Sequence, residues 1–164
     1  LFDEKDHHAA SWGLRLGFEN KRWGGSINYN QISSEGKYLM PREWGKDPFF
    51  TFMPRERNEG LGGVNALVAR SMYQIPNWGL KIHPSIGYFL LPSVDNYALN
   101  KYGMPSYTQT NIEFIWDAQK ILKGAEIQVL YVNKHNQGDT KENSKYILNK
   151  VDMSTWNFIV NYQW

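Results

Sequence analysis

Cysteine is absent from the 164 residues of the chain. Disulfide bonds and thiolate metal sites are therefore excluded. The sequence also lacks any apolar run near the roughly 18 residues that a transmembrane helix requires, so no such helix is predicted. The excess of positive over negative charge is also small, because the formal net charge is +2, and the Lys and Arg residues form no block. Nucleic acid is therefore not an expected partner.

Aromatic residues, by contrast, are abundant and make up 15% of the chain, with seven Trp and ten Tyr. In the last nine residues, a large apolar or aromatic side chain stands at every even position from Trp156 to Trp164. Successive side chains of a β-strand point to opposite faces, so one face of this segment is apolar. Apolar bands flanked by aromatic residues are typical of outer-membrane β-barrels. The terminal strand also resembles the signal that the outer-membrane assembly machinery recognises, and that machinery is an expected partner.

Seven segments of this alternating kind are predicted to be strands. They cover residues 11–19, 23–31, 63–74, 80–91, 107–117, 125–134 and 156–164. In the third segment we place Leu67 and Tyr73 outward, because this register turns Arg70 inward and an Arg facing lipid at mid-membrane costs about 2 to 4 kcal/mol. In the fourth, Pro84 cannot donate a ladder hydrogen bond, so a β-bulge is predicted there. The predicted fold class is all-β, an antiparallel transmembrane β-barrel.

The connections between these segments alternate in length. Those at 20–22, 75–79 and 118–124 are short, whereas those at 33–62, 92–106 and 135–151 are long. Outer-membrane barrels have short periplasmic turns, long extracellular loops and an even number of strands, so the first strand here is expected to start on the extracellular side. Residues 1–164 are therefore predicted to be the C-terminal portion of one larger barrel, completed by N-terminal strands that this sequence lacks. No secretory signal peptide opens the sequence either.

The longest connection, residues 33–62, is rich in large apolar side chains. They are Tyr38, Leu39, Met40, Trp44, Phe49, Phe50, Phe52 and Met53. Loops of this length are usually functional or disordered, and this composition argues against disorder. We predict that the loop folds into the barrel mouth and narrows the pore, with a constriction formed by Arg42, Trp44, Phe49, Phe50, Arg55 and Arg57. The alternative is a loop that packs over the rim or onto a partner chain.

Several short stretches resemble the OprD-type porins and their distant relatives. They are residues 42–45 (Arg-Glu-Trp-Gly), 48–51 (Pro-Phe-Phe-Thr), 54–60 (Pro-Arg-Glu-Arg-Asn-Glu-Gly), 63–66 (Gly-Val-Asn-Ala) and 99–102 (Leu-Asn-Lys-Tyr). The resemblance implies a monomeric channel of about 18 strands in the outer membrane of a Gram-negative bacterium. The solutes of such a channel are small and often carry a carboxylate, and Arg and Lys side chains follow the wall of its lumen. The resemblance also implies that residues 33–62 are the seventh extracellular loop, which forms the constriction together with the third.

The charged side chains that are predicted to face the lumen fall into two groups. The basic group is Arg15, Arg70, Lys81 and His83, and the acidic group is Glu113, Asp117 and Glu126. A basic stripe that faces an acidic one creates a transverse field, which influences the ions that enter a pore. Arg15 and Arg70, with the loop arginines, are predicted to guide a carboxylate by bidentate pairing. In the alternative interpretation, these charges hydrate the lumen or hold the loop in place, as we expect for residues 55–59.

Catalysis is not expected, although some outer-membrane barrels are enzymes. His83 is the only histidine in a predicted strand, and Ser85 on the same face lies about 6 to 7 Å away by strand geometry, too far for a hydrogen bond. His7 and His8 lie near acidic residues and could bind a metal ion, but a solvated loop is the simpler interpretation. Neither a metal nor a cofactor is therefore predicted.

The sequence thus predicts an outer-membrane porin, surrounded by membrane lipid, for passive uptake of small polar solutes that are anionic or zwitterionic. The alternative is a non-conducting barrel that acts as a scaffold or accessory subunit of an outer-membrane protein complex. A soluble β-sandwich is a third possibility. It would bury the apolar face of residues 156–164 against another sheet.

Overall fold

The structure, a computed structural model, describes residues 8–39, 49–56, 58–119 and 121–164. Nearly all regular structure in these residues is β-strand, and the one helical element found among them is the short 3-10 helix η1 (Ser144–Tyr146). No helix in the described part of the chain has the length and apolar character needed to cross a membrane. The protein is therefore an all-β structure, as predicted.

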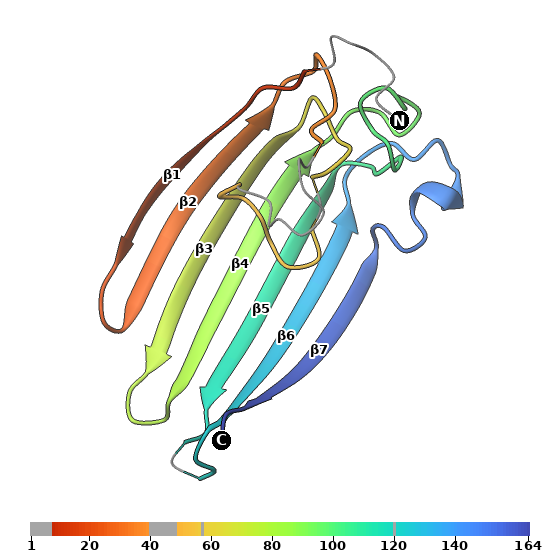
Figure 1. Cartoon of the computed structure of the whole chain (residues 1–164). Coiled ribbons are helices and arrows are strands. Elements are labelled where there is room, and N and C mark those ends of the chain that lie inside the picture. Colours follow the sequence, from red (N-terminus) through yellow and green to blue (C-terminus); the bar gives the residue numbers. More distant parts are fainter. Residues whose placement is uncertain (1–7, 40–48, 57, 120) are drawn as a thin grey trace.

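Seven strands form a single antiparallel sheet in which each strand pairs with its neighbours in the sequence (Figure 1). The strands are β1 (Ser11–Glu19), β2 (Trp23–Ile32), β3 (Asn65–Ile75), β4 (Leu80–Leu90), β5 (Tyr107–Asp117), β6 (Ala125–Asn136) and β7 (Met153–Tyr162). Because the spatial order follows the chain, the sheet is a meander with β1 and β7 at its two edges.

The seven predicted strands are all present in the structure. The first and fifth have the predicted bounds, and the second, third, fourth and sixth differ by one or two residues at an end. The terminal strand begins at Met153 rather than at Trp156, because residues 153–155 pair with residues 132–134 of β6. It ends at Tyr162. The alternating pattern therefore locates every strand, while the pairing partner sets where the last one begins.

The β-bulge predicted at Pro84 is wrong. Pairing between β3 and β4 continues from Arg70 opposite Ser85 to Tyr73 opposite Ile82, so each strand has two residues between these pairs. A bulge requires an extra residue on one strand, and neither strand has one here. On its other side, Pro84 stays in register with β5. The missing N–H of Pro84 therefore interrupts the ladder to β3 without shifting its register.

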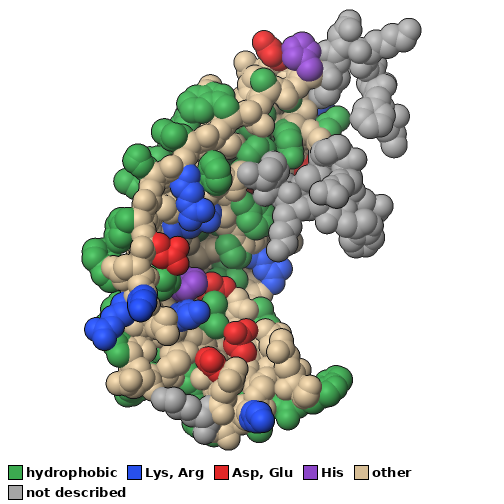
Figure 2. Space-filling view, turned by 60° about the vertical axis from the view of Figure 1, so that its left-hand side comes forward, with side chains coloured by type: hydrophobic (Ala, Val, Ile, Leu, Met, Phe, Trp, Pro, Cys, Tyr) green, Lys and Arg blue, Asp and Glu red, His purple; other side chains and the backbone are tan. Residues whose placement is uncertain are grey.

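The sheet is curved, and its two faces differ in chemistry. Large apolar side chains protrude at alternate positions from the outer side, here called the convex face (Figure 2). Charged side chains gather in the hollow of the other side, the concave face (Figure 2). The register predicted for the third strand is confirmed, because Leu67 and Tyr73 are exposed on the convex face while Arg70 is half-buried on the concave face.

The connections divide between the two ends of the sheet, as predicted. Short connections at 20–22, 76–79 and 118–124 join strands at one end, the turn end, and long ones at 33–64, 91–106 and 137–152 join them at the other, the loop end (Figure 1). The main hydrophobic core combines residues of the strands and of the long connections. Its buried members are Ile32, Phe49, Met53, Leu61, Val64, Ala66, Val68, Phe89, Leu91, Tyr107 and Val151.

Candidate functional site

Part of the longest connection, residues 49–56, lies on the concave face, where side chains of four strands hold it. Three strands each donate a side-chain hydrogen bond to a backbone carbonyl of this segment. The bonds join Arg70 of β3 to Phe52, Gln109 Nε2 of β5 to Pro54 at 2.7 Å, and Lys134 Nζ of β6 to Arg55 at 2.7 Å. The Arg55 side chain in turn donates to Oδ1 of Asn157 on β7. The segment therefore lies against the inner side of the sheet rather than over its rim.

Packing also holds this segment against the sheet. Met53 is fully buried in a core that it shares with Val68 and Phe89 of the strands, and within the loop the ring of Phe49 meets that of Tyr38 edge to face, with 4.9 Å between centroids. Gly87 of β4 makes room for Met53, because a Cβ built on Gly87 would lie 2.8 Å from the Met53 sulfur, closer than side chains allow. A glycine at this position therefore lets the loop approach the backbone of β4.

Two charged side chains are buried where the segment meets the sheet: Lys134 of β6, with an exposed fraction of 7%, and Glu56 of the segment itself, with an exposed fraction of 6%. The Lys134 ammonium lies 4.9 Å from the ring centroid of Tyr107, in a cation–π arrangement. Glu56 accepts a 3.0 Å hydrogen bond at Oε2 from the backbone N–H of Met53, and its charge interacts with that of Lys134. Buried charges are costly unless they are paired and hydrogen-bonded. Lys134 and Glu56 are together called the Lys134–Glu56 anchor, in which the contact between strand and loop is the hydrogen bond from the Lys134 ammonium to the Arg55 carbonyl.

A second long connection, residues 91–106, is hydrogen-bonded to the first, residues 33–64. Two backbone hydrogen bonds of 2.8 and 3.1 Å join residues 60–62 to residues 99–101. Glu59 accepts hydrogen bonds from Lys101 Nζ at 3.3 Å and from the Tyr102 hydroxyl at 3.0 Å. Two of the stretches that carry the resemblance to the OprD-type porins are thus in direct contact, although about 40 residues of sequence separate them.

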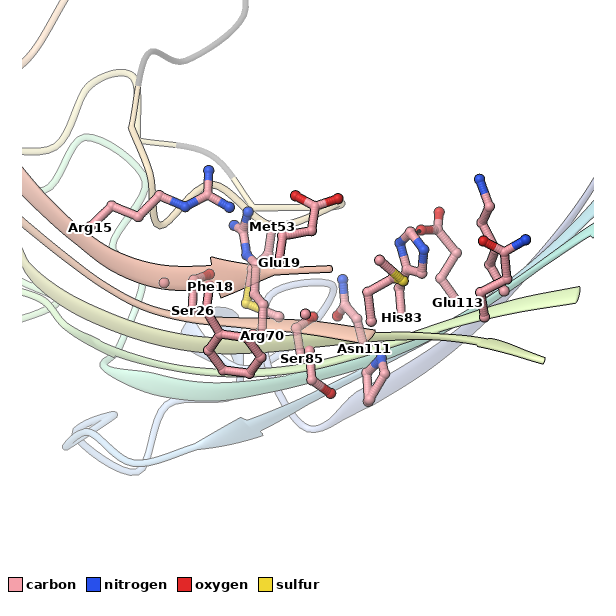
Figure 3. Close-up of a pocket in the computed structure, with 18 of the residues that line it drawn as sticks. Arg15, Phe18, Glu19, Ser26, Met53, Arg70, His83, Ser85, Asn111 and Glu113 are labelled. Carbon is pink, nitrogen blue, oxygen red and sulfur yellow. Dashed lines mark ion pairs between the residues drawn. The ribbon is translucent and has the colours of Figure 1, made fainter. Parts of the chain in front are cut away.

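Nearer the turn end, the concave face forms a cavity of about 930 Å³. Five of the predicted pore-lining residues meet in its wall: Arg15, Arg70, Lys81, His83 and Glu113. Figure 3 shows Arg15, Arg70 and Glu19 projecting from the same side of the sheet. The loop contributes Phe52, Met53 and Pro54 to the same wall. The cavity is thus bounded by charged strand residues, among them the acidic Glu19 and Glu113, and by the segment that crosses the sheet.

His83 and Glu113 face each other across β4 and β5 (Figure 3). Nδ1 of His83 lies 3.5 Å from one carboxylate oxygen of Glu113, and Gln128 of β6 donates a hydrogen bond to the other oxygen. Ser85, the predicted same-face neighbour of His83, lines the same cavity. The glutamate therefore joins three strands in a polar network within the wall.

The other two acidic candidates, Asp117 and Glu126, are not among the residues that line this cavity. They lie directly opposite each other at the turn end of β5 and β6. Glu126 accepts a 3.1 Å hydrogen bond at Oε1 from Asn161, and Asp117 accepts one of 3.1 Å at Oδ1 from the backbone N–H of Gln119. The predicted acidic group is therefore divided between the cavity wall and the end of the sheet.

The six predicted constriction residues differ in what the structure shows of them. Arg42, Trp44 and Arg57 lie outside the described residues. Phe49 is buried in the core between loop and sheet, Phe50 is 44% exposed, and Arg55 is exposed but bonded to β7. None of these last three belongs to the cavity wall.

Sequence reasoning missed the roles of Lys134 and Glu56. The alternating pattern, continued beyond Leu130, places Lys134 on the concave face together with Glu126, so the direction of its side chain was available. No local pattern could reveal its partner, because the carbonyl group that it binds lies 79 residues away in the chain. Contacts between a loop and a distant strand depend on the assembled sheet.

Among the residues that the structure describes, no group of three or more His, Asp or Glu could hold a metal ion. His8 lies 3.3 Å from a carboxylate oxygen of Glu35, while His7 and the acidic residues before it lie outside the described residues. Neither a scan against protein-family models nor a search of curated proteins gave a match for this chain.

Proposed function

We propose that this chain is part of the wall of an outer-membrane porin in a Gram-negative bacterium. In this proposal the convex face contacts lipid, the concave face lines a water-filled lumen, and residues 33–62 form a constriction. Small polar solutes that are anionic or zwitterionic diffuse past it. The observation that carries the proposal is the position of residues 49–56, which cross the concave face above a charged cavity.

The contrast between the two faces supports a membrane setting. Leu14, Leu16 and Ile27 are each about 60% exposed on the convex face, within a continuous row of apolar side chains. Large exposed apolar surfaces of this kind mark membrane or protein contacts. A lipid-facing apolar band, a polar lumen and long loops at one end are the arrangement of outer-membrane barrels. A meander of antiparallel strands is also the topology of an up-and-down barrel.

The charges in the cavity support a preference for carboxylate-bearing solutes. Arg15, Arg70 and Lys81 line the space beneath the loop, and Ser26 and Asn111 add neutral hydrogen-bonding groups. A guanidinium group can hold a carboxylate through two parallel hydrogen bonds. A solute that passes between the loop and the wall meets these groups. The resemblance to OprD-type porins favours the same function, with these seven strands as part of a barrel of about 18.

Single-channel recording in planar bilayers tests the proposal. The full-length protein is compared with a variant that lacks residues 49–56 and with a control that lacks residues 139–142, an exposed part of the last long connection. We expect discrete conductance from all three, with a larger value for the first deletion because the segment no longer narrows the lumen. No conductance from any of them would overturn the proposal.

A second candidate function is a non-conducting barrel that serves as a scaffold or accessory subunit of an outer-membrane complex. The core between loop and sheet, together with the Lys134–Glu56 anchor, favours it because both are compatible with a permanently closed lumen. This candidate predicts no conductance even after deletion of residues 49–56, and stable co-purification with another outer-membrane protein. Recovery of the natural protein without detergent would instead favour a soluble β-sandwich.

A further inference from the structure

We propose that a groove on the convex face, at the turn end, binds an acyl chain of a membrane phospholipid. The groove has a volume of about 610 Å³ and lies between the connections at 76–79 and 118–124. Its volume falls within the range of about 300 to 1,000 Å³ that is usual for small-molecule sites. This inference rests on the membrane setting of the proposed function and adds a defined lipid site to it.

The floor of the groove is formed by three neighbouring strands. Leu80, Trp116 and Ile127 lie opposite one another in one cross-strand row, and Phe114 and Val129 pair in the next row. All five side chains point to the convex face by the strand alternation. The floor is therefore continuous with the apolar surface that we propose to contact lipid.

The two short connections, residues 76–79 and 118–124, form the sides of the groove. Trp78 comes from one of them and Ile121 from the other, with exposed fractions of 70% and 77%. Large apolar side chains this exposed on a tight turn have little reason to face water. They turn an otherwise open apolar face into a groove that can surround a narrow apolar chain.

The indole and several backbone N–H groups of the groove lining already have partners. The Trp116 indole donates a 3.1 Å hydrogen bond to the carbonyl oxygen of Trp78. The backbone N–H groups of Asp117, Ala118 and Ile121 donate hydrogen bonds of 2.8 to 3.0 Å to carbonyls of the two connections and of β6. A polar solute or an added β-strand needs free donors and acceptors, whereas a hydrocarbon chain needs none. An acyl chain is therefore the occupant whose chemistry matches the groove.

The position of the groove also suits a lipid. Trp78 and Trp116 stand at the turn end, and tryptophans in barrels form girdles at the membrane interface. From this level the floor extends along Phe114 and Val129 toward the middle of the strands. The acyl chain would thus enter beside the connection at 118–124 and run toward the membrane interior, with its headgroup at the turn end.

Photo-crosslinking of the full-length protein tests this site. The protein is reconstituted in vesicles of phosphatidylethanolamine and phosphatidylglycerol that contain a phospholipid with a diazirine in its acyl chain. After irradiation, labelled peptides are mapped by mass spectrometry. We expect several-fold more label per residue at Trp78 and residues 114–129 than at Leu14 and Leu16, the equally apolar convex side chains of β1.

Two substitutions serve as a matched pair. Ile121→Ser removes a side of the groove and is expected to lower labelling of residues 114–129 to the level of β1. Leu122→Ser changes the next exposed side chain, which does not line the groove, and is expected to leave the labelling unchanged.

Equal labelling of the groove and of β1, or labelling that Ile121→Ser does not reduce, would overturn the lipid site while leaving the membrane setting intact. If neither region is labelled, the membrane setting itself fails, and the lipid site fails with it.

Discussion

The two halves of the concave face are built from the same strands, yet they differ completely in environment. Toward the loop end, residues 49–56 cover Val68, Phe89 and Gln109, all of which are 1% exposed or less. Toward the turn end, Arg15 and Lys81 stand in a cavity. One half is a buried core and the other is a charged cavity.

At the loop end, the burial of some polar strand residues depends on the loop. Gln109 is fully buried on the concave face and donates hydrogen bonds to Pro54 of the loop at 2.7 Å and to Asn111 at 3.0 Å. A buried amide without a partner costs about 1 to 3 kcal/mol. The loop supplies the carbonyl groups that make such burial possible, and where it ends the wall stays polar and open.

The largest effect is expected from Phe89→Ala, which disrupts the buried core at the loop end. Phe89 is 1% exposed and stacks on Tyr107, with 4.7 Å between ring centroids. Removing a buried phenylalanine leaves a cavity and lowers the free energy of unfolding by about 3 to 5 kcal/mol. Denaturant unfolding of the detergent-solubilised protein measures this loss.

Phe18→Ala is the matched control for this substitution. Phe18 lies on the convex face of β1 and is 54% exposed. Its removal is expected to change the free energy of unfolding much less, and similar losses for the two variants would show that the loop end has no special core.

The next largest effect is expected from releasing the loop with Lys134→Met. Methionine keeps the length of the side chain but removes the ammonium that donates to the Arg55 carbonyl. The lost hydrogen bond weakens docking of residues 49–56 by about 1 to 3 kcal/mol. Limited proteolysis is expected to cut this segment faster than in the unmodified protein. Lys81→Met in the open half is the control, and equal cleavage rates for the two variants would contradict the anchor.

A smaller effect is expected from Arg70→Gln, which changes the boundary between the two halves. Arg70 lines the cavity and donates to the Phe52 carbonyl, so the substitution removes a charge and a loop contact together. An interaction with a partly exposed charge is worth about 0.2 to 1 kcal/mol, so the anion-to-cation permeability ratio should fall by up to about fivefold. Reversal potentials in a salt gradient measure this ratio.

Arg70→Lys separates the two roles of this residue. It keeps the positive charge and is expected to preserve the permeability ratio while altering the loop contact. If the lysine variant loses as much selectivity as Arg70→Gln, the charge is not the cause.

The smallest effect concerns the contact between Lys101 and Glu59 at the loop end, and it depends on pH. The hydrogen bond to Glu59 raises the pKa of Lys101 above its ordinary value of 10.5. Its contribution to loop docking is therefore complete below about pH 10.5 and is lost as the pH rises through the raised pKa. Proteolysis of the loop is expected to increase slightly in that range. Lys101→Met removes this increase, and an unchanged pH profile in the variant would contradict the role of the pair.

The strands could be predicted because their pattern is local. Alternation of side chains within about ten residues locates a strand and divides its residues between two faces, and the cost of an Arg that faces lipid assigns Arg70 to the concave face, where the structure has it. The prediction of a bulge at Pro84 was wrong because the missing N–H group of Pro84 affects one hydrogen bond only, and the strand register continues past this residue.

The site was predictable only in part. Alternation brings Arg15, Arg70, Lys81, His83 and Glu113 to one face, and the structure gathers them in one cavity. The loop contacts were not predictable, because residues such as Lys134 and Glu56 take their roles from the way that distant segments meet. The type of amino acid at such a position does not by itself indicate which distant residue it contacts.

Gly87 gives the proposed channel an adjustable dimension. The loop rests where this residue has no side chain, so the height of Met53 above β4 is set by the size of one uncharged residue. The arginines of the wall lie elsewhere in the sheet and set the charge. In the proposed channel, a substitution of Gly87 is therefore expected to change the space beneath the loop without removing a charge, whereas Arg70 contributes both to the charge of the wall and to the position of the loop.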